Sequence, residues 1–229
     1  MRHLAELLKW DVLLLQRNQL FALAAVMAAM YVGLFYLLRP LGNLETVLII
    51  LVFNDPVVTG FLFAGVLLLF DKNQNTLQAL QVVPLPLDYY VLSKTLALAL
   101  LSTLTALVMV LAAHGPRFQY AHLLLGVFLT GGLFTLFGFV LGARARTFNH
   151  FLLYTMGLLL VMAVPFLGLF GIGPEGLYLL FPSFAGLKLL QATFGPVPAG
   201  QLLYAYGYLV LWLVGTWFYT LREFKRLSL

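Results

Sequence analysis

The sequence predicts an all-α, polytopic membrane protein with six transmembrane helices in one domain that spans residues 1–229. Two observations predict this class. Of the 229 residues, 62% are hydrophobic and only 9% are charged, whereas soluble domains carry about 25% charged residues. The apolar residues form long unbroken runs rather than short alternating segments, which favours helices over a membrane β-barrel. Cysteine is absent, which excludes disulfides and cysteine metal sites.

Residues 1–19 predict a helix that lies on the membrane surface before the chain enters the bilayer. Apolar side chains such as Leu4 and Leu8 fall on one side of this helix, and charged side chains such as Lys9 fall on the other. Asp11 interrupts the apolar side. The segment lacks the apolar core and the small-residue cleavage site of a signal peptide.

Six apolar runs follow, each long enough to cross a bilayer. They cover residues 20–38, 47–70, 91–113, 122–142, 152–170 and 202–221. With a cytoplasmic N-terminus, ten of the 13 Lys and Arg residues lie in cytoplasmic segments, and only Arg39, Arg117 and Lys188 lie outside. Positive residues favour the cytoplasmic side. We therefore expect both termini on the cytoplasmic side of the cell inner membrane. The net charge of +5 reflects this bias and does not indicate nucleic-acid binding.

Asn54, Asp55 and Pro56 interrupt the second run. A charge inside a bilayer is costly and usually functional, so one interpretation is a carboxylate that faces a substrate or proton path. The other is a helix start, with Asp55 as the N-cap and Pro56 as the first helical residue. In that case a short outer helix over about 44–53 precedes the main span. Both interpretations can hold together.

The connection between the second and third runs predicts a short amphipathic helix parallel to the membrane. Asp71 and Gln74 have the spacing of a capping box. Leu77 and Leu80 follow on one side of the helix, and Pro84 stops it. On these residues alone, an ordinary loop helix that packs on lipid is an equally good interpretation.

A longer pattern covers this connection, residues 71–90, and the start of the third run. Its residues are Asp71, Lys72, Thr76, Leu77, Ala79, Leu80, Val82, Pro84, Leu85, Tyr90, Leu92 and Lys94. This pattern resembles the cytosolic loop of ABC type-2 permeases, and the small drug-export permeases described for fluoroquinolones are the most similar in appearance. Family members commonly have Glu where Asp71 stands. In those permeases a short coupling helix docks in a cleft of a separate ATP-binding subunit. The resemblance implies coupling roles for Asp71, Lys72, Thr76, Leu77, Leu80 and Pro84.

This resemblance implies a transport subunit that is not itself an enzyme. A Walker A motif needs Gly before Lys, and none of the five lysines follows a glycine. We therefore expect no cofactor on this chain, with ATP and Mg²⁺ bound by a partner subunit. A second copy or a related permease would complete the pathway, surrounded by membrane lipids. The expected activity is export of a small amphipathic or hydrophobic compound.

Three alternatives remain open at this point. The permease of cytochrome c maturation that exports haem has a similar length and a similar Pro-Leu-Pro-Leu loop. An ion-gradient-driven carrier would depend on Asp55 and need no ATPase. A membrane scaffold would bind partners without moving a cargo.

Residues 171–201 form a long outer connection rich in Pro and Gly. Within it, residues 181–194 are apolar but too short to span, which indicates a re-entrant or surface-lying helix. Pro182 and Ser183 mark its start, with Ser183 as the expected cap, and Lys188 is expected to face lipid headgroups. The type-2 permeases have similar short helices that close the outer end of the pathway. An ordered outer loop that packs on the bundle is the alternative.

Two further patterns concern packing. Gly138-x-x-x-Gly142 in the fourth run permits close helix approach, either inside one subunit or between subunits. The aromatic side chains of the last run suit interfacial belts, or else the wall of a path for aromatic cargo. They are Tyr204, Tyr206, Tyr208, Trp212, Trp217 and Tyr219. The four histidines are scattered, so we expect no metal site.

Overall fold

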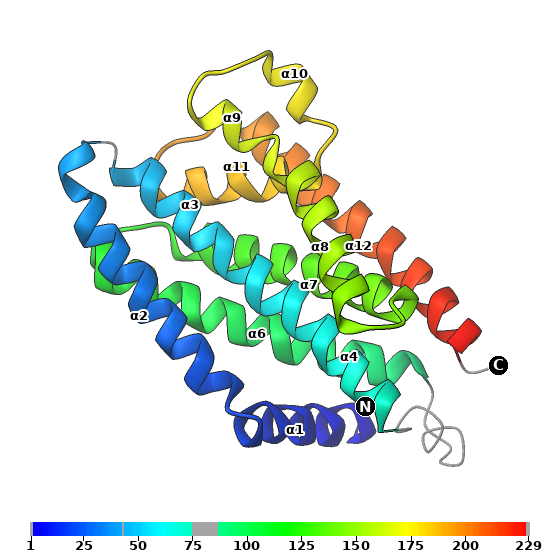
Figure 1. The fold of residues 1–229 in the computed structure, drawn as a ribbon. Helices are drawn as coiled ribbons and strands as arrows, with labels where there is room; N and C mark the ends of the chain where they lie inside the picture. The colour runs from blue at the N-terminus through cyan, green and yellow to red at the C-terminus, as the bar shows by residue number, and fades with distance from the viewer. Residues whose placement is uncertain (1, 43, 75–86, 228–229) are drawn as a thin grey trace.

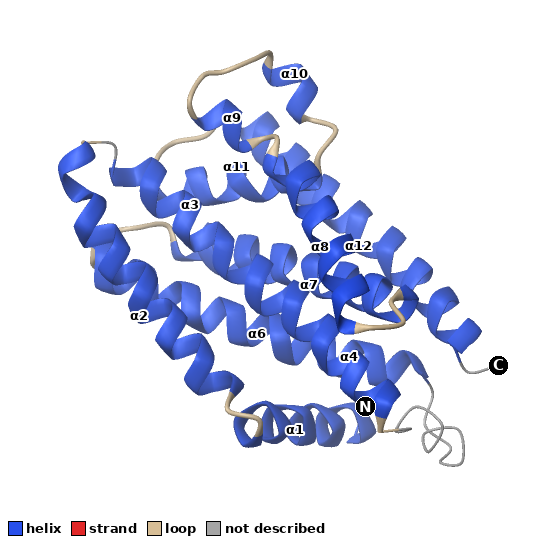
Figure 2. Ribbon diagram, in the orientation of Figure 1, coloured by secondary structure: helices blue, strands red, loops and turns tan. Residues whose placement is uncertain are grey.

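The computed structural model describes residues 2–42, 44–74 and 87–227, and this part of the chain is helical with no strand (Figures 1 and 2). In chain order the elements are α1 (Arg2–Arg17), α2 (Leu20–Leu38), η1 (Arg39–Leu41), α3 (Leu44–Pro56), η2 (Val57–Leu62), α4 (Phe63–Asn73), α6 (Leu87–His114), α7 (Tyr120–Arg144), α8 (Phe148–Ala163), α9 (Phe166–Leu169), α10 (Glu175–Tyr178), α11 (Pro182–Phe194) and α12 (Ala199–Leu227).

The six predicted spans are all present. Among the described residues, six helical stretches are long and apolar enough to cross a bilayer, and each contains one of the predicted apolar runs or nearly all of it. They are Leu20–Leu38, Leu44–Asn73, Leu87–His114, Tyr120–Arg144, Phe148–Leu169 and Ala199–Arg226. The predicted all-α, polytopic class is therefore confirmed.

The two ends of the bundle differ. Helix α1, the end of α4, the start of α6 and the last turns of α12 lie at one end, which we call the termini end (Figure 1). The short helices α9, α10 and α11 lie at the opposite end (Figure 1). The polar segments that the sequence assigns to one side of the membrane therefore gather at the termini end.

The helix predicted over residues 1–19 is present as α1, which packs against α6 and α2. Its inner side contributes the buried Leu15 and the half-buried Leu8 and Val12 to an apolar cluster with α6. Gln19 has a left-handed backbone, with φ 59°, which turns the chain sharply from α1 into α2. Figure 1 shows α1 lying across the base of the bundle.

The second span is one continuous helix, in which α3 and α4 flank the π-helical turn η2. The helix start predicted at Asp55 and Pro56 is therefore wrong. Pro56 has helical dihedral angles, with φ −60° and ψ −31°, and no side chain caps the residues that follow it. A π turn shifts the backbone hydrogen-bond register, so the helix continues past a residue that has no N–H to donate.

Helix α7 packs most extensively against α4, η2, α6, α11 and α12, and it also contacts α3 and α8. Glycines make the closest approaches possible. A Cβ on Gly60 of η2 would lie 2.8 Å from the carbonyl oxygen of Gly131, and one on Gly142 would lie 3.1 Å from the Cα of Gly65. A Cβ on Gly138 would meet the backbone of Phe61. Gly138 and Gly142 therefore pack inside the chain, as the simpler of the two interpretations predicts.

The helix predicted over residues 181–194 is α11, which is buried against α3, α7 and α12. Ten of its 13 residues are buried, so the helix packs into the bundle. The predicted cap is wrong. Pro182 is the first helical residue, and the Ser183 hydroxyl is buried without a hydrogen-bond partner instead of capping the helix. Proline needs no cap for its own nitrogen, so the helix begins there without a side-chain acceptor.

Candidate functional site

A buried ion cluster joins α1, α4 and α6 at the termini end. The Lys94 ammonium lies 3.4 Å from the Asp11 carboxylate and 3.6 Å from the Asp71 carboxylate. The Lys94 side chain is 7% exposed, and each carboxylate side chain is 17% exposed. With Tyr90 and Ser93, these residues form what we call the base cluster. Its one ammonium and two carboxylates carry a net charge of −1.

Hydroxyl groups complete the pairing of both carboxylates. The Tyr90 hydroxyl donates to Asp71, and the Ser93 hydroxyl donates to Asp11. The Lys94 ammonium also lies 5.0 Å from the centre of the Tyr90 ring. Each carboxylate therefore contacts one ammonium and one hydroxyl. Such pairing is what allows charges to be buried at a tolerable cost in free energy.

Helical spacing explains why these residues meet. Tyr90, Ser93 and Lys94 are separated by three and four positions along α6, so their side chains share one face. Asp71 lies in the last turn of α4, next to that face. Asp11, which interrupts the apolar side of α1, points at Lys94 rather than at solvent. The base cluster therefore brackets the 75–86 segment, with Asp71 before it and Tyr90 and Lys94 after it.

Lys72 binds the end of a fourth helix. Its ammonium donates to the carbonyl oxygens of Gly142, Ala143 and Ala145, at 3.3, 3.0 and 2.9 Å. These oxygens lie at the C-terminal end of α7, where carbonyls lack partners within the helix and carry partial negative charge. A lysine suits this position because its ammonium donates hydrogen bonds to the free carbonyls and its positive charge is attracted to them. Two of the predicted coupling residues, Asp71 and Lys72, therefore anchor the end of α4 to its neighbours.

The other predicted coupling residues, Thr76, Leu77, Leu80 and Pro84, lie outside the described residues. The capping role predicted for Asp71 is wrong, because α4 runs on to Asn73 and Asp71 lies inside its last turn. An N-cap residue must have a non-helical backbone. Asp71 instead binds Lys94 and Tyr90.

A second polar site lies within the bundle at the start of η2. Asp55 is fully buried. It accepts a hydrogen bond from the Thr105 hydroxyl of α6, and the Thr59 hydroxyl lies 3.5 Å away. Asn54 faces elsewhere. Its side-chain amide donates to the carbonyl of Ile50 at 2.9 Å, and it lines a cavity of about 360 Å³. Asp55 therefore ties the second span to the third.

The opposite end holds an ion pair between Lys188 of α11 and Glu175 of α10, at 2.7 Å. The Lys188 side chain is 15% exposed and lies 5.1 Å from the centre of the Phe184 ring. The prediction that Lys188 faces headgroups is wrong. Lys188 instead pairs with Glu175 within the protein. Within the described residues, no group of three His, Asp or Glu side chains is placed to hold a metal ion.

The model of the fluoroquinolones export permease protein family matches residues 2–229. The chain belongs to this family. Two similar relatives are the fluoroquinolones export permease proteins of Mycobacterium tuberculosis strains CDC 1551 / Oshkosh and ATCC 25618 / H37Rv. Each is 28% identical over 165 residues, which cover 71% of this chain and 70% of the relative. The resemblance inferred from the 71–90 connection is confirmed.

This export permease has a further ion cluster at the termini end, which the sequence did not predict. The Arg144 guanidinium of α7 lies 2.9 Å from the Glu223 carboxylate of α12 and donates to the Tyr219 hydroxyl. Arg226 lies 3.4 Å from the same carboxylate. The base cluster was not predicted either, although the position of Asp11 on the apolar side of its helix indicated a buried partner. An acidic residue on the apolar side of an amphipathic helix indicates a buried cationic partner.

Proposed function

We propose that this permease is the membrane subunit of an ATP-driven ABC exporter. A separate ATP-binding subunit would dock on the 75–86 segment and hold ATP and Mg²⁺. Two permease chains, identical or related, would enclose the pathway. Both termini would face the cytoplasm across the inner membrane, as the distribution of Lys and Arg indicates. The cargo would be a small amphipathic or hydrophobic compound, and the names of the relatives make a fluoroquinolone the first cargo to test.

The base cluster carries this proposal. A loop that transmits movement needs rigid attachment at both ends, and Asp71 and Lys94 attach the two flanking helices to each other at 3.6 Å. Asp11 adds α1 to the same unit, and Lys72 adds α7. When the ATPases close, movement of the 75–86 segment would therefore reach four helices together. Asp71 and Lys72 would position the docking segment, while Leu77 and Leu80 would contact the ATPase.

The test replaces the apolar contact with a charge. In a complex reconstituted with its ATPase, Leu77→Glu or Leu80→Glu should abolish the stimulation of ATP hydrolysis by the permease and abolish transport. Gln78→Glu is the matched control, because it adds the same charge on the polar side of the predicted helix. It should retain most of both activities. Transport and stimulated hydrolysis that survive both leucine changes would overturn the coupling assignment.

Asp55 favours a second candidate, an ion-gradient-driven carrier. A buried carboxylate within a transmembrane bundle is a site where a proton or cation can bind. This function predicts that the purified chain transports cargo into liposomes when driven by a pH gradient alone, and that Asp55→Asn stops it. Transport that requires ATP and the ATPase subunit would exclude the carrier.

A further inference from the structure

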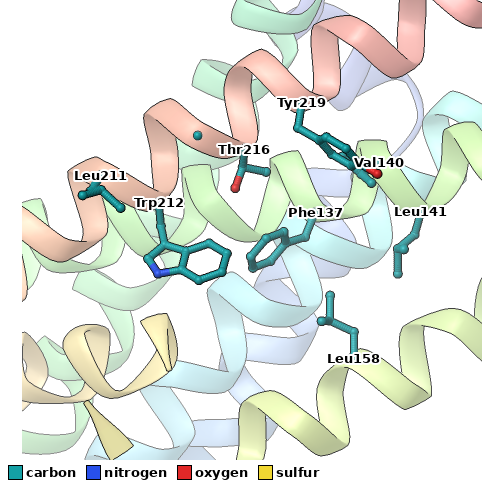
Figure 3. A pocket seen from close by; sticks show the side chains of 9 residues that line it. Phe137, Val140, Leu141, Leu158, Leu211, Trp212, Thr216 and Tyr219 are labelled. Carbon is teal, nitrogen blue, oxygen red and sulfur yellow. The ribbon is translucent and has the colours of Figure 1, made fainter. Parts of the chain in front are cut away.

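A cavity of about 550 Å³ lies between α7, α8 and α12 (Figure 3). Pockets that bind drug-sized molecules range from about 300 to 1,000 Å³. The cavity is lined along α12 from Leu211 to Tyr219, a rise of about 12 Å. Leu211 lines the cavity and is 65% exposed, so the cavity opens to the outside of the bundle. A molecule dissolved in the bilayer can therefore enter it directly.

The walls of the cavity are aromatic and aliphatic. The rings of Phe137 and Trp212 meet edge to face, with centres 6.2 Å apart and planes at 76°. Leu158 of α8 faces them across the space (Figure 3). This geometry is one that aromatic rings prefer. A flat aromatic molecule in the cavity would therefore contact ring faces and edges on one side and aliphatic carbons on the other.

One end of the cavity lies beside a positively charged side chain, and we call it the positive end. Thr216 and Tyr219 line this end (Figure 3). Arg144 follows Phe137 by seven positions on the same face of α7, and it donates to the Tyr219 hydroxyl. Arg144, Arg226 and Glu223 together carry a net charge of +1, and the two arginine side chains are 47% and 58% exposed. An anionic group at this end would lie near the Arg144 guanidinium, which also pairs with Glu223.

We propose that this cavity is the binding site for a planar aromatic molecule that carries an anionic group, with its rings between Phe137, Trp212 and Leu158 and its anion near Arg144. The proposal rests on the proposed export of small amphipathic compounds and names the site and the chemical class. A second permease chain is a poorer occupant, because a transmembrane helix is about 30 Å long and the cavity covers less than half of that. A lipid acyl chain would use neither the ring contacts nor the positive end.

The test uses two fluorescent probes with the same rings. Anilinonaphthalene sulfonate carries an anionic group, and phenylnaphthylamine lacks it. Both are titrated into the purified permease in lipid nanodiscs, without an ATPase, and empty nanodiscs give the background. We expect saturable binding of both probes, with the anionic probe binding about fivefold more tightly, the scale of a half-exposed ionic contact.

Two matched pairs of variants locate the site. Gly215 lines the cavity and has open space beside it, so Gly215→Leu should fill the cavity and weaken both probes at least tenfold. Gly207→Leu, also beside open space on α12, should leave binding unchanged. Arg144→Gln should remove the fivefold preference for the anionic probe and leave the neutral probe unchanged. Arg222→Gln, which makes the same charge change outside the cavity, should preserve the preference.

Three outcomes would overturn the proposal. Absence of saturable binding would indicate a lipid acyl chain in the cavity. Equal binding to wild type and Gly215→Leu would place the probes elsewhere. A change of oligomeric state in Gly215→Leu would indicate a second chain. The result is independent of the ATPase, so probe binding with this pattern stands even if no ATPase couples to the chain. Conversely, if the chain exports cargo with an ATPase but Gly215→Leu does not change probe binding, the proposed function stands and the proposed binding site is wrong.

Discussion

Replacing Lys94 with methionine should destabilise the permease far more than replacing either of its carboxylate partners. The change leaves Asp11 and Asp71 buried with no cation. Each of these side chains is 17% exposed, and breaking a buried pair by removing one partner costs about 3 kcal/mol. Asp11→Asn instead leaves one ammonium and one carboxylate, which balance. It should lower the free energy of unfolding by about 1 kcal/mol or less, because the amide oxygen still accepts from Ser93.

The assay is equilibrium unfolding in mixed micelles, followed by the loss of helical circular dichroism. A triple variant provides the sharpest comparison, because Lys94→Met with Asp11→Asn and Asp71→Asn is neutral and nearly the same shape. The triple variant should lose about 1.5 kcal/mol of its free energy of unfolding. This loss is smaller than that of Lys94→Met alone, since no charge remains unpaired. The assigned charge pairing would be refuted if Lys94→Met and Asp11→Asn lowered the free energy of unfolding equally. It would also be refuted if the triple variant were less stable than Lys94→Met.

The remaining predictions concern three other contacts. Lys72→Met should lower the free energy of unfolding by about 1–3 kcal/mol through the loss of its bonds to the end of α7, and Lys72→Arg should recover part of it in the same assay. Gly60→Ala should cost about 1–3 kcal/mol, because its Cβ would press on Gly131, whereas Gly157→Ala, in open space, should be neutral or slightly stabilising. Asp55→Asn keeps an acceptor for Thr105, so a flux assay should show most of the ATP-driven transport; loss of transport with normal assembly would assign its charge a direct role.

The spans were predictable because bilayer crossing depends on length and hydropathy, which any stretch of sequence displays locally. The predicted run 20–38 coincides with α2. The interruption at Asp55 and Pro56 was misread for the opposite reason. Both residues suit a helix start locally, but Thr105 and the glycine contact with α7 hold them inside a continuous helix. Tertiary packing outweighs capping preference there.

The polar sites were harder to predict, because their partners are far apart in sequence. Ser93 and Asp11 are 82 positions apart, and Tyr90 and Asp71 are 19 apart. The motif shared with the type-2 permeases marked Asp71 and Lys94 without showing that they form an ion pair. Lys188 looked free for lipid because its partner, Glu175, lies in a separate short helix. Helical periodicity shows on which face of its helix a side chain lies, but it does not identify the residue of another helix that the side chain contacts.

The base cluster also has a mechanical consequence. A load applied to the 75–86 segment cannot simply stretch the loop, because Asp71 and Lys94 clamp the two helices from which the loop emerges. The load divides between α4 and α6 in parallel, and Asp11 and Lys72 spread it to α1 and α7. The Arg144–Glu223 ion pair passes the same load from α7 to α12, and these two helices also pack against each other. Displacement of the 75–86 segment should therefore move the five helices as one body.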